Sequence, residues 1–310
     1  MRAVVIANPA ARKGGCKRDW PEIDARLRRH LPDFAVRFTR HQGHATALAR
    51  EAVAAGYDTF IAVGGDGTVN EVVNGMIENG IQARPDMALC PIPAGTANEL
   101  CLALGLLQDE DAPYRNIVMG AKKNIDLIDV RCAGVEGGEA QRYGYAIACF
   151  GAAAEISYRT SASRFLKKLG GRFSYYCQTL LVTLTYPYWQ ASLRIDDQPQ
   201  RTVTIYTGLA CNTPNGGGGM KLAPGASFED GVLDLVLFRD ITRRDIIFQK
   251  PSWLYEGRHV EHPKVEVVRG RRIAVEGPPM ALVDLDGETV GRLPMIATVL
   301  PKAVTVKALA

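Results

Sequence analysis

Over its first 130 residues, the chain alternates short apolar, often β-branched runs with longer stretches whose apolar residues recur at helical spacing. Strands and helices that take turns in this way favour a parallel sheet with helical crossovers. We expect strands at residues 3–8, 34–39, 57–65 and 87–93, and helices at residues 20–31, 43–56 and 68–80. The alternation therefore predicts an α/β domain over residues 1–128, with any ligand at the carboxyl ends of its strands.

Beyond this domain, short β-rich runs follow one another, separated by turn signals such as Asp286-Gly287. Two helical segments, at about residues 162–186 and 242–256, interrupt these runs, and Thr242 is suited to cap the second. We predict that residues 129–310 form a mostly antiparallel β-sandwich domain, or an open barrel, with a few helices. Its last strand could return to the first domain. The expected strands lie at residues 124–133, 142–151, 189–196, 201–211, 231–238, 264–270, 271–277, 280–290 and 297–309.

Composition narrows the class of partner and the compartment. The 37 Lys and Arg residues outnumber the 33 Asp and Glu residues only slightly, so nothing indicates nucleic acid. The seven cysteines are scattered and never form a CxxC pair, which is typical of reduced, buried thiols rather than of a disulfide frame or a zinc site. The opening apolar run is too short for an export signal, and the most apolar segment, residues 175–189, is too short to span a bilayer. We expect a cytoplasmic protein, soluble or resting on the inner membrane face, of undetermined oligomeric state.

The stretch FIAVGGDGTVNEVVNG, residues 60–75, leaves an expected strand through glycines and enters an expected helix at once. Gly64 and Gly65 lack a Cβ and can take positive φ angles, so their amides can approach a phosphate closely. A plain strand-to-helix turn is the alternative interpretation. The stretch is neither a P-loop nor a dinucleotide fingerprint, because no GxxxxGK[ST] occurs and Glu71 stands near the place of a third glycine.

A second loop has the same design. PIPAGTANEL, residues 91–100, leaves an expected strand through Pro93 and Gly95, and its Thr96 and Asn98 offer a hydroxyl and an amide. Two strand ends with small polar loops would form a two-sided cradle for a charged, oxygen-rich ligand.

A third candidate loop follows the first expected strand. In NPAARKGGCKR, residues 8–18, the basic residues Arg12, Lys13 and Lys17 could neutralise phosphate charge. A solvated basic loop explains this stretch nearly as well.

Taken together, these motifs resemble the diacylglycerol kinase catalytic-domain family, which includes bacterial soluble lipid kinases and the sphingosine and ceramide kinases. VGGDGTVNEVVNG looks like the family signature, PAGTANEL like its second nucleotide loop, and NIDLIDV like its crossover into the second domain. SRFLKKLGGRFSYY resembles the helix beside the lipid cleft. GGGMKLAPGASFEDGVLDLVLF, HPKVEVVRGRRIAVE and LDGETVGRLP then appear in the family's order. The resemblance covers nearly the whole chain, and the ordered set is much more specific than any one motif.

The resemblance implies a two-domain kinase that binds ATP between its domains and phosphorylates a lipid hydroxyl. Asp286 matches the family's general base and Glu288 its neighbour in the site, while Asp230 matches an acidic position linked to magnesium. ATP and Mg²⁺ are therefore the expected cofactors. The positions that match the nucleotide-binding loops are Asn8, Gly64, Gly65, Asp66, Gly67, Thr68, Gly95, Thr96 and Asn98.

The residue types suit this chemistry. Phosphoryl transfer needs positioning, charge neutralisation and an acceptor for the hydroxyl proton. Asp286 could accept that proton, and Asp66 or Asp230 could hold Mg²⁺. Ordinary alternatives exist for two of these carboxylates, because Asp286-Gly287 is also a hairpin-turn signal and Asp230-Gly231 also suits a turn before a strand.

The chain departs from the family pattern in several places. Ala10 and Ala11 stand where a serine often follows Asn-Pro, which leaves the phosphate contacts of that loop open, and Glu99 stands where aspartate is frequent. Ala153 replaces an aspartate thought to meet the lipid head group in many members. An amine such as that of sphingosine would lose its ionic partner there, so we expect a neutral, diacylglycerol-like acceptor.

A soluble kinase with a lipid substrate has to take that lipid from a membrane. In residues 163–176, apolar and basic side chains are interleaved, which suits a helix on an anionic membrane surface. A helix that packs between domains and exposes a basic face is the alternative.

Two other functions compete with a lipid kinase. The first is a kinase of a soluble acceptor such as NAD, since NAD kinases share the glycine-aspartate-glycine loop. They usually follow it with Asn-Glu and an aspartate, whereas Asn98-Glu99 here leads into Leu100-Cys101. The second is a non-catalytic lipid- or nucleotide-binding regulator, against which the presence of all the expected carboxylates counts.

Overall fold

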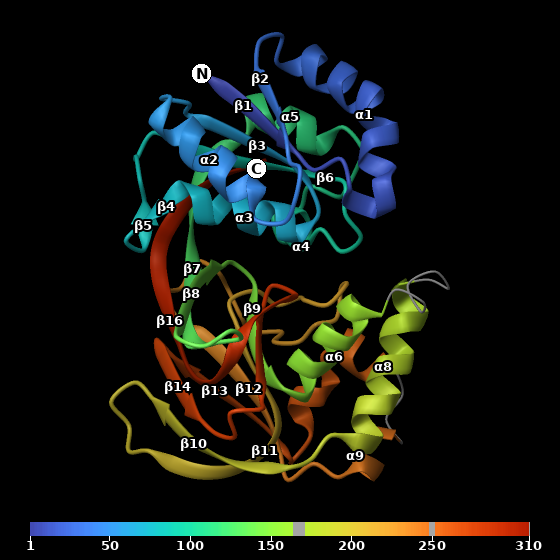
Figure 1. Ribbon diagram of the computed structural model, residues 1–310, viewed down its shortest axis with the longest axis vertical. Coiled ribbons are helices and arrows are strands. Elements are labelled where there is room, and N and C mark those ends of the chain that lie inside the picture. Colours follow the sequence, from blue (N-terminus) through green and yellow to red (C-terminus); the bar gives the residue numbers. More distant parts are fainter. Residues whose placement is uncertain (164–170, 248–251, 310) are drawn as a thin grey trace. The chain divides into compact units, whose positions relative to one another are not determined.

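The structure, a computed structural model, describes residues 1–163, 171–247 and 252–309. The chain forms two compact units (Figure 1). The first comprises Met1–Leu127 and the chain from Leu300 onward, and the second comprises Ile128–Val299. The predicted second domain, 129–310, thus extends past the second unit at its C-terminal end. Two long strands, β7 (Ala121–Gly134) and β16 (Glu288–Ala308), each contain residues of both units.

Parallel strands form the sheet of the first unit. They are β1 (Ala3–Ala7), β2 (Ala35–Phe38), β3 (Thr59–Gly64) and β6 (Ala88–Pro93), in the order β2-β1-β3-β6. Each of these pairings is parallel, and the end of β16 adds a further parallel neighbour to β6 through Val306 and Leu89. β1 and β3 are buried along their whole length, as expected for a parallel sheet covered on both faces. The predicted α/β class is confirmed.

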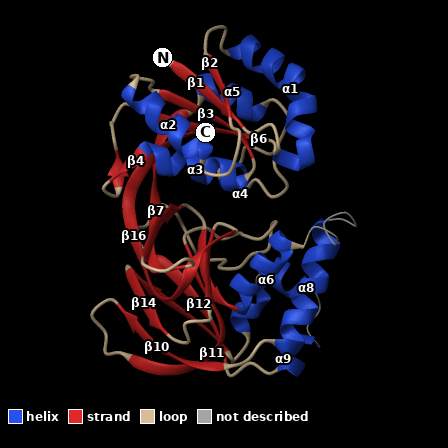
Figure 2. Ribbon diagram, viewed as in Figure 1, coloured by secondary structure: helices blue, strands red, loops and turns tan. Residues whose placement is uncertain are grey.

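Helices connect these strands (Figure 2). They are α1 (Ala11–His30), α2 (His44–Ala54), α3 (Asp66–Met76), α4 (Glu99–Ala103) and α5 (Ala112–Met119). On one face of the sheet, Leu27 of α1 and Ile117 of α5 share a core with Val5 and Ile61. On the other, α2 and α3 pack closely at Gly75, where an added Cβ would lie 2.5 Å from the Cβ of Ala49.

The predicted start of the first helix is wrong. Helical structure begins at Ala11 instead of residue 20, and is interrupted where Arg12, Lys13 and Gly14 have φ angles of 54°, 58° and 86°. Pro21 therefore lies inside the helix rather than near its first turn. The basic loop predicted after β1 is in consequence shorter than expected.

The predicted end of the third helix is also wrong. α3 stops at Met76, and the residues beyond it form a hairpin of β4 (Ile77–Glu78) and β5 (Ile81–Gln82). Asn79 and Gly80 make the turn with φ angles of 52° and 85°. Asn-Gly between β-branched residues is a strong hairpin signal, and it outweighs the helical spacing here.

The second unit is an antiparallel β-sandwich-like domain, as predicted. Its main strand order is β13-β12-β11-β10-β14-β16, and β9 lies between β11 and β15. Pairings such as β11–β12, β14–β16 and β15–β16 are antiparallel. Besides β7 and β16, its strands are β8 (Glu139–Gly144), β9 (Ile147–Gly151), β10 (Trp189–Ile195), β11 (Arg201–Cys211), β12 (Leu233–Arg239), β13 (Val265–Gly270), β14 (Arg272–Glu276) and β15 (Leu282–Leu285).

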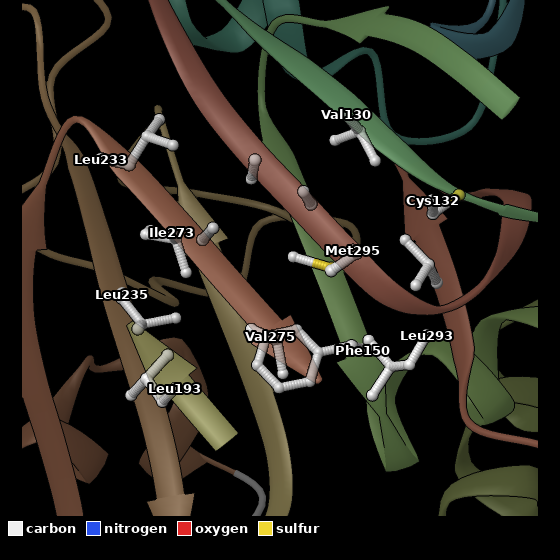
Figure 3. Close-up of a cluster of buried hydrophobic side chains, with 14 of the residues drawn as sticks. Val130, Cys132, Phe150, Leu193, Leu233, Leu235, Ile273, Val275, Leu293 and Met295 are labelled. Atoms are coloured by element: carbon white, nitrogen blue, oxygen red, sulfur yellow. The ribbon is translucent and has the colours of Figure 1, made fainter. Parts of the chain in front are cut away.

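A cluster of buried apolar side chains lies inside this domain (Figure 3). Leu233 and Leu235 of β12 point into it at the period of two that a half-buried strand requires. Phe150 of β9 and Leu293 and Met295 of β16 are labelled in the same cluster, and all three are almost fully buried. The core thus anchors β16, which begins at the predicted catalytic residue Glu288, two positions after Asp286.

Helices interrupt the strands of the second unit. They are α6 (Ala152–Ala162), α8 (Gly171–Thr185), α9 (Arg243–Ile247), α10 (Ser252–Tyr255) and the 3-10 helix η1 (Arg258–Glu261). α6 was not predicted as a separate helix. The predicted cap at Thr242 is confirmed, because its Oγ1 accepts the Asp245 N–H at 3.2 Å and its own N–H donates to Asp245 Oδ2 at 2.7 Å. In the described part of the chain, no helix is long and apolar enough to cross a bilayer.

The single strand expected over residues 142–151 is divided into β8 and β9. Between them, the amides of Tyr145 and Ala146 donate to the carboxylate of Asp286 instead of to a neighbouring strand. A side chain that is far away in the sequence therefore interrupts a pattern that locally reads as one strand.

Candidate active site

The residues predicted to bind phosphate lie in loops at the carboxyl ends of the first unit's strands. Asn8 follows β1, Gly64 ends β3, Gly65 precedes α3, and Gly95 follows β6. A Cβ on Gly95 would lie 2.3 Å from the Cα of Gly65, and a Cβ on Gly65 would lie 3.1 Å from the Cα of Gly95. Only glycine at both positions allows this approach of two backbones. Main-chain groups gathered at this edge of a parallel sheet are suited to contact a phosphate.

Asp66 joins the two glycine loops. Its Oδ2 accepts the Asn98 N–H at 2.9 Å, and its Oδ1 accepts the Glu99 N–H at 2.6 Å. Asn98 has a left-handed φ of 54°, and its own Oδ1 accepts the Gly95 N–H at 3.0 Å. The predicted residues Asp66, Gly95 and Asn98 therefore belong to one hydrogen-bonded group, in which Asp66 orients the second loop.

Asn8 attaches the loop after β1 to the same group of loops. Its Nδ2 donates to Thr68 Oγ1 at 3.0 Å, and its Oδ1 accepts the Ala10 N–H at 3.0 Å. Thr68 packs so closely on Gly64 that a Cβ there would lie 2.5 Å from the threonine Cβ. Asn8, Gly64 and Thr68 are thus brought together, while Thr96 is exposed on the second loop.

Glu71 is a residue of this region that the sequence patterns did not predict. It is buried in α3, and its two carboxylate oxygens accept the N–H groups of Gly43 and Ala45 at 2.8 and 3.0 Å. Glu71 of α3 therefore fixes the N-terminus of α2. An acidic residue on the buried side of a predicted helix was the available signal, because a buried carboxylate needs partners.

The basic residues after β1 could neutralise phosphate charge only where their side chains can reach it. Arg12 forms an ion pair with Asp19 of α1. Lys13 and Lys17 have exposed side chains. Their predicted part in neutralising phosphate charge stays a prediction.

In the second unit, Asp286 and Gly287 form the turn between β15 and β16, with φ angles of 53° and 86°. The hairpin-turn interpretation is therefore confirmed. The Asp286 Oδ2 accepts the Tyr145 N–H at 2.9 Å, and its Oδ1 accepts the N–H groups of Ala146 and Ile147, each at 3.0 Å. Three backbone donors stabilise a negative charge on this side chain.

Glu288 and Asn212 complete the surroundings of this turn. The Glu288 carboxylate forms an ion pair with Arg142 of β8 at 2.8 Å. Asn212 is fully buried, and its Nδ2 donates to the Tyr145 carbonyl at 2.9 Å. Asp286 and Glu288, predicted as a catalytic pair, thus lie at one hairpin end, where Asp286 binds the amides of residues 145–147 and Glu288 binds β8.

Asp284 is the second unpredicted residue. Its side chain is 3% exposed, its Oδ2 accepts the Ser157 hydroxyl at 2.7 Å, and its Oδ1 accepts the Gly287 N–H at 2.9 Å. Burial raises the pKa of the Asp284 carboxyl from 3.8 to about 7. The charges of Asp286 and Glu288 also raise this pKa, while the bonds from Ser157 and Gly287 oppose the rise.

Asp230, the predicted metal position, lies in the turn before β12, where Gly231 has a φ of 71°. Its Oδ2 forms an ion pair with Arg269, and its Oδ1 accepts the Val232 N–H at 3.2 Å. The carboxylate of Asp230 thus takes part in a turn and an ion pair, and its predicted part as a metal ligand stays a prediction. Within residues 1–163, 171–247 and 252–309, no group of three or more His, Cys, Asp or Glu is placed to hold a metal ion.

Family models match both halves of the chain. The model of the diacylglycerol kinase catalytic domain matches residues 2–130, and that of the YegS C-terminal NAD kinase beta sandwich-like domain matches residues 146–308. These matches cover the loops of the first unit and the Asp286 hairpin of the second.

Whole-chain comparisons agree with these models. A diacylglycerol kinase of Staphylococcus haemolyticus is 32% identical over 301 residues, which cover 94% of this chain and 83% of that protein. A Chromohalobacter salexigens protein, named a probable lipid kinase YegS-like, is 32% identical over 271 residues, covering 86% of this chain and 81% of its own length. A crystal structure of a Bacillus anthracis protein has a TM-score of 0.77 at 22% identity, covers 99% of this chain and 95% of its own, and thus shares the fold.

The raised pKa of Asp284 predicts a pH-dependent stability. The Asp284 carboxyl binds its proton more tightly in the folded state than in the unfolded state. Its contribution to the stability of the folded state is therefore complete below pH 3.8 and is lost as pH rises towards about 7. Asp284→Asn removes the titration and keeps a hydrogen-bonding side chain. The free energy of unfolding of this variant should increase relative to that of wild type as pH rises from 4 to 8. Since each pKa unit corresponds to about 1.4 kcal/mol, the increase should be at most about 4 kcal/mol.

Urea unfolding at several pH values measures this difference. Asp197→Asn, at an exposed position of the β10–β11 connection, is the matched control and should show no such trend. A constant difference between Asp284→Asn and wild type across this range would contradict the prediction.

Proposed function

The chain belongs to the diacylglycerol kinase catalytic-domain family, and from that membership we propose that it transfers the γ-phosphate of ATP to a hydroxyl group of a diacylglycerol-like lipid. The observation that carries the proposal is the contact of the two glycine loops at Gly65 and Gly95, which Asp66 holds together. Lipid kinases of the family, including the relatives from Staphylococcus, are the source of the proposed substrate class.

The glycine loops are proposed to hold the triphosphate. Two backbones in contact leave no side chain between them, so N–H groups can face an anion directly. Asn8 and Thr68 add an amide and a hydroxyl at the neighbouring strand end. Electrostatic positioning of this kind is the main protein contribution to phosphoryl transfer.

Asp286 is proposed to accept the proton of the lipid hydroxyl. Its carboxylate accepts hydrogen bonds from three amides, which keep it oriented. Glu288, fixed by Arg142, would lie next to it and orient the acceptor. Transfer then forms a bond from the lipid oxygen to the γ-phosphorus, breaks the bond to ADP, and leaves the proton on Asp286.

The proposal for the acceptor depends on Ala153. This residue lies in the first turn of α6, and its N–H donates to Thr207 Oγ1 at 3.1 Å. An alanine offers no charge to pair with an amine, which favours a neutral diacylglycerol-like head group. Because Asp230 binds Arg269, we assign no step to a metal at that residue; Mg²⁺ would reach the reaction as the usual companion of ATP.

The decisive experiment offers radiolabelled ATP and a total lipid extract to the protein and identifies the labelled product by mass spectrometry. A labelled phosphatidic-acid-like product supports the proposal. Label on NAD in a parallel reaction would support the soluble-acceptor alternative. Nucleotide binding without ATP consumption, with any lipid, would favour the non-catalytic regulator.

The Asp286→Asn variant tests the proton acceptor. We expect kcat to fall by about a thousandfold with little change in the KM for ATP, because the amide cannot take the proton. The variant could also loosen the Tyr145–Ile147 segment. Asn212→Ala is the matched control, because it removes another anchor of that segment and leaves the Asp286 carboxylate in place. Equal losses in the two variants would mean that Asp286 is only an anchor.

The Gly95→Ala variant tests the phosphate cradle. The new methyl group would collide with Gly65 and separate the two loops, so we expect ATP affinity to fall at least tenfold in isothermal titration. Gly225→Ala is the control, since the nearest atom recorded for an added Cβ there is Asp234 Oδ1, at 4.0 Å. Unchanged ATP affinity in Gly95→Ala would rule out binding between these loops.

Membrane contact is proposed through the surface of α8. Of residues 163–176, which the sequence predicts to meet an anionic membrane, residues 164–170 lie outside the described residues. Further along α8, Leu180, Leu181 and Leu184 are 45%, 46% and 49% exposed, close together on one side of the helix. Apolar side chains on this helix could enter the boundary between head groups and acyl chains.

Vesicle sedimentation tests this contact. The double variant Leu181→Ser, Leu184→Ser should bind anionic vesicles about tenfold more weakly than wild type. A leucine side chain contributes about 1.5–3 kcal/mol when it is fully buried, and less when it enters only the membrane interface. Val118→Ser on α5 removes a similarly exposed apolar residue and serves as the control. If wild type does not sediment with anionic vesicles, the proposed contact is wrong.

A further inference from the structure

A buried polar link joins helix α6 to the hairpin that carries Asp286. Ser157 lies on α6, and its Oγ is 2.7 Å from Asp284 Oδ2 and 3.4 Å from the Gly287 carbonyl oxygen. Asp284 Oδ1 in turn accepts the Gly287 N–H at 2.9 Å. Both polar groups of the Gly287 backbone are therefore within hydrogen-bonding distance of this pair.

The turn that the pair contacts has an unusual backbone. Asp286 has a φ of 53°, a region that costs energy for a residue with a side chain, and Gly287 continues at 86°. The direction of the Asp286 carboxylate depends on this backbone, because the side chain is short. Contacts that hold Gly287 therefore also set where the Asp286 oxygens lie.

Burying the Asp284 carboxyl group has an unfavourable desolvation free energy. Its carboxyl is almost completely enclosed, at 3% exposure. An apolar residue would pack in a β-strand core without the desolvation penalty of a carboxyl group. The hydrogen bonds from Ser157 and Gly287 offset part of that penalty, and they join α6 to the turn through Asp284.

We propose that Ser157 and Asp284 are positioning residues that hold the Asp286–Glu288 turn in the geometry required for its chemistry. For its catalytic consequence, this inference rests on the proposed kinase function. Neither residue need touch substrate. They contact the backbone of Gly287, and the position of Gly287 in turn sets the position of Asp286.

The link can persist in both protonation states of Asp284. When the carboxyl is ionised, the Ser157 hydroxyl donates to it. When it is protonated, it can donate to Ser157 Oγ, and the serine proton is then available to the Gly287 carbonyl. The groups that face Asp284 are Ser157 on α6, the Cys149 thiol on β9 at 3.9 Å, and the charged Asp286 and Glu288 on its own hairpin.

Paired variants test the proposal. Ser157→Ala removes the hydroxyl, and Ser157→Thr keeps it. We expect Ser157→Ala to lower kcat about tenfold with the KM for ATP unchanged, since small displacements of a reacting group are costly, and Ser157→Thr to retain activity within about threefold. In Asp284→Asn, the amide side chain can still accept a hydrogen bond from the Gly287 N–H and donate one to Ser157, so this variant should also retain activity within about threefold. Ser192→Ala on β10 is the control for loss of a serine hydroxyl elsewhere in the unit.

Amide hydrogen exchange provides a readout that does not depend on activity. In Ser157→Ala, the amides of residues 286–288 should exchange about tenfold faster than in wild type, and Ser157→Thr should restore their protection. Unchanged exchange in Ser157→Ala, or equal effects of alanine and threonine, would overturn the proposal. If wild type phosphorylates no lipid, the proposed function fails, and the exchange experiment still decides whether the pair holds the turn.

Discussion

Hydrogen bonds from loop amides to acidic side chains hold the candidate site in shape. Asp66 accepts the amides of Asn98 and Glu99, and Glu71 accepts two amides at the start of α2. Asp286 accepts three amides where β9 begins. Amides that leave a strand or helix still need partners, and an ionised carboxylate is a stronger acceptor than a neutral oxygen. Each loop therefore depends on a carboxylate that comes from another part of the chain.

This dependence connects folding with the proposed chemistry. Asp66 and Asp286 are positions that the family resemblance assigns to nucleotide binding and proton transfer, and both also organise backbone. A carboxylate fixed by several donors loses little freedom when a substrate binds, which is what phosphoryl transfer requires of its catalytic groups. The hairpin-turn and general-base interpretations of Asp286 are for the same reason compatible, since the turn directs the carboxylate.

Much of the fold could be predicted because it depends on local pattern. Apolar periodicity located β1, β3 and β6, and the loops at their ends followed from the parallel arrangement. The pattern failed where a competing local signal was stronger, as at Asn79-Gly80, and where a distant side chain intervened, as between β8 and β9. Glu71 and Asp284 escaped prediction because their partners lie elsewhere in the sequence.

The sequence by itself determined the two kinds of domain, the family, and the positions of the glycine loops and of the Asp286 turn. Each of these depends on the spacing or order of residues along the chain. Only the tertiary structure decided which groups meet: Asn98 is 32 positions from Asp66, and Ala146 is 140 positions from Asp286. It also decided that Asp230 pairs with Arg269 and that Asp284 is buried against Ser157. Such contacts depend on how strands and helices pack, and no local run of residues records that.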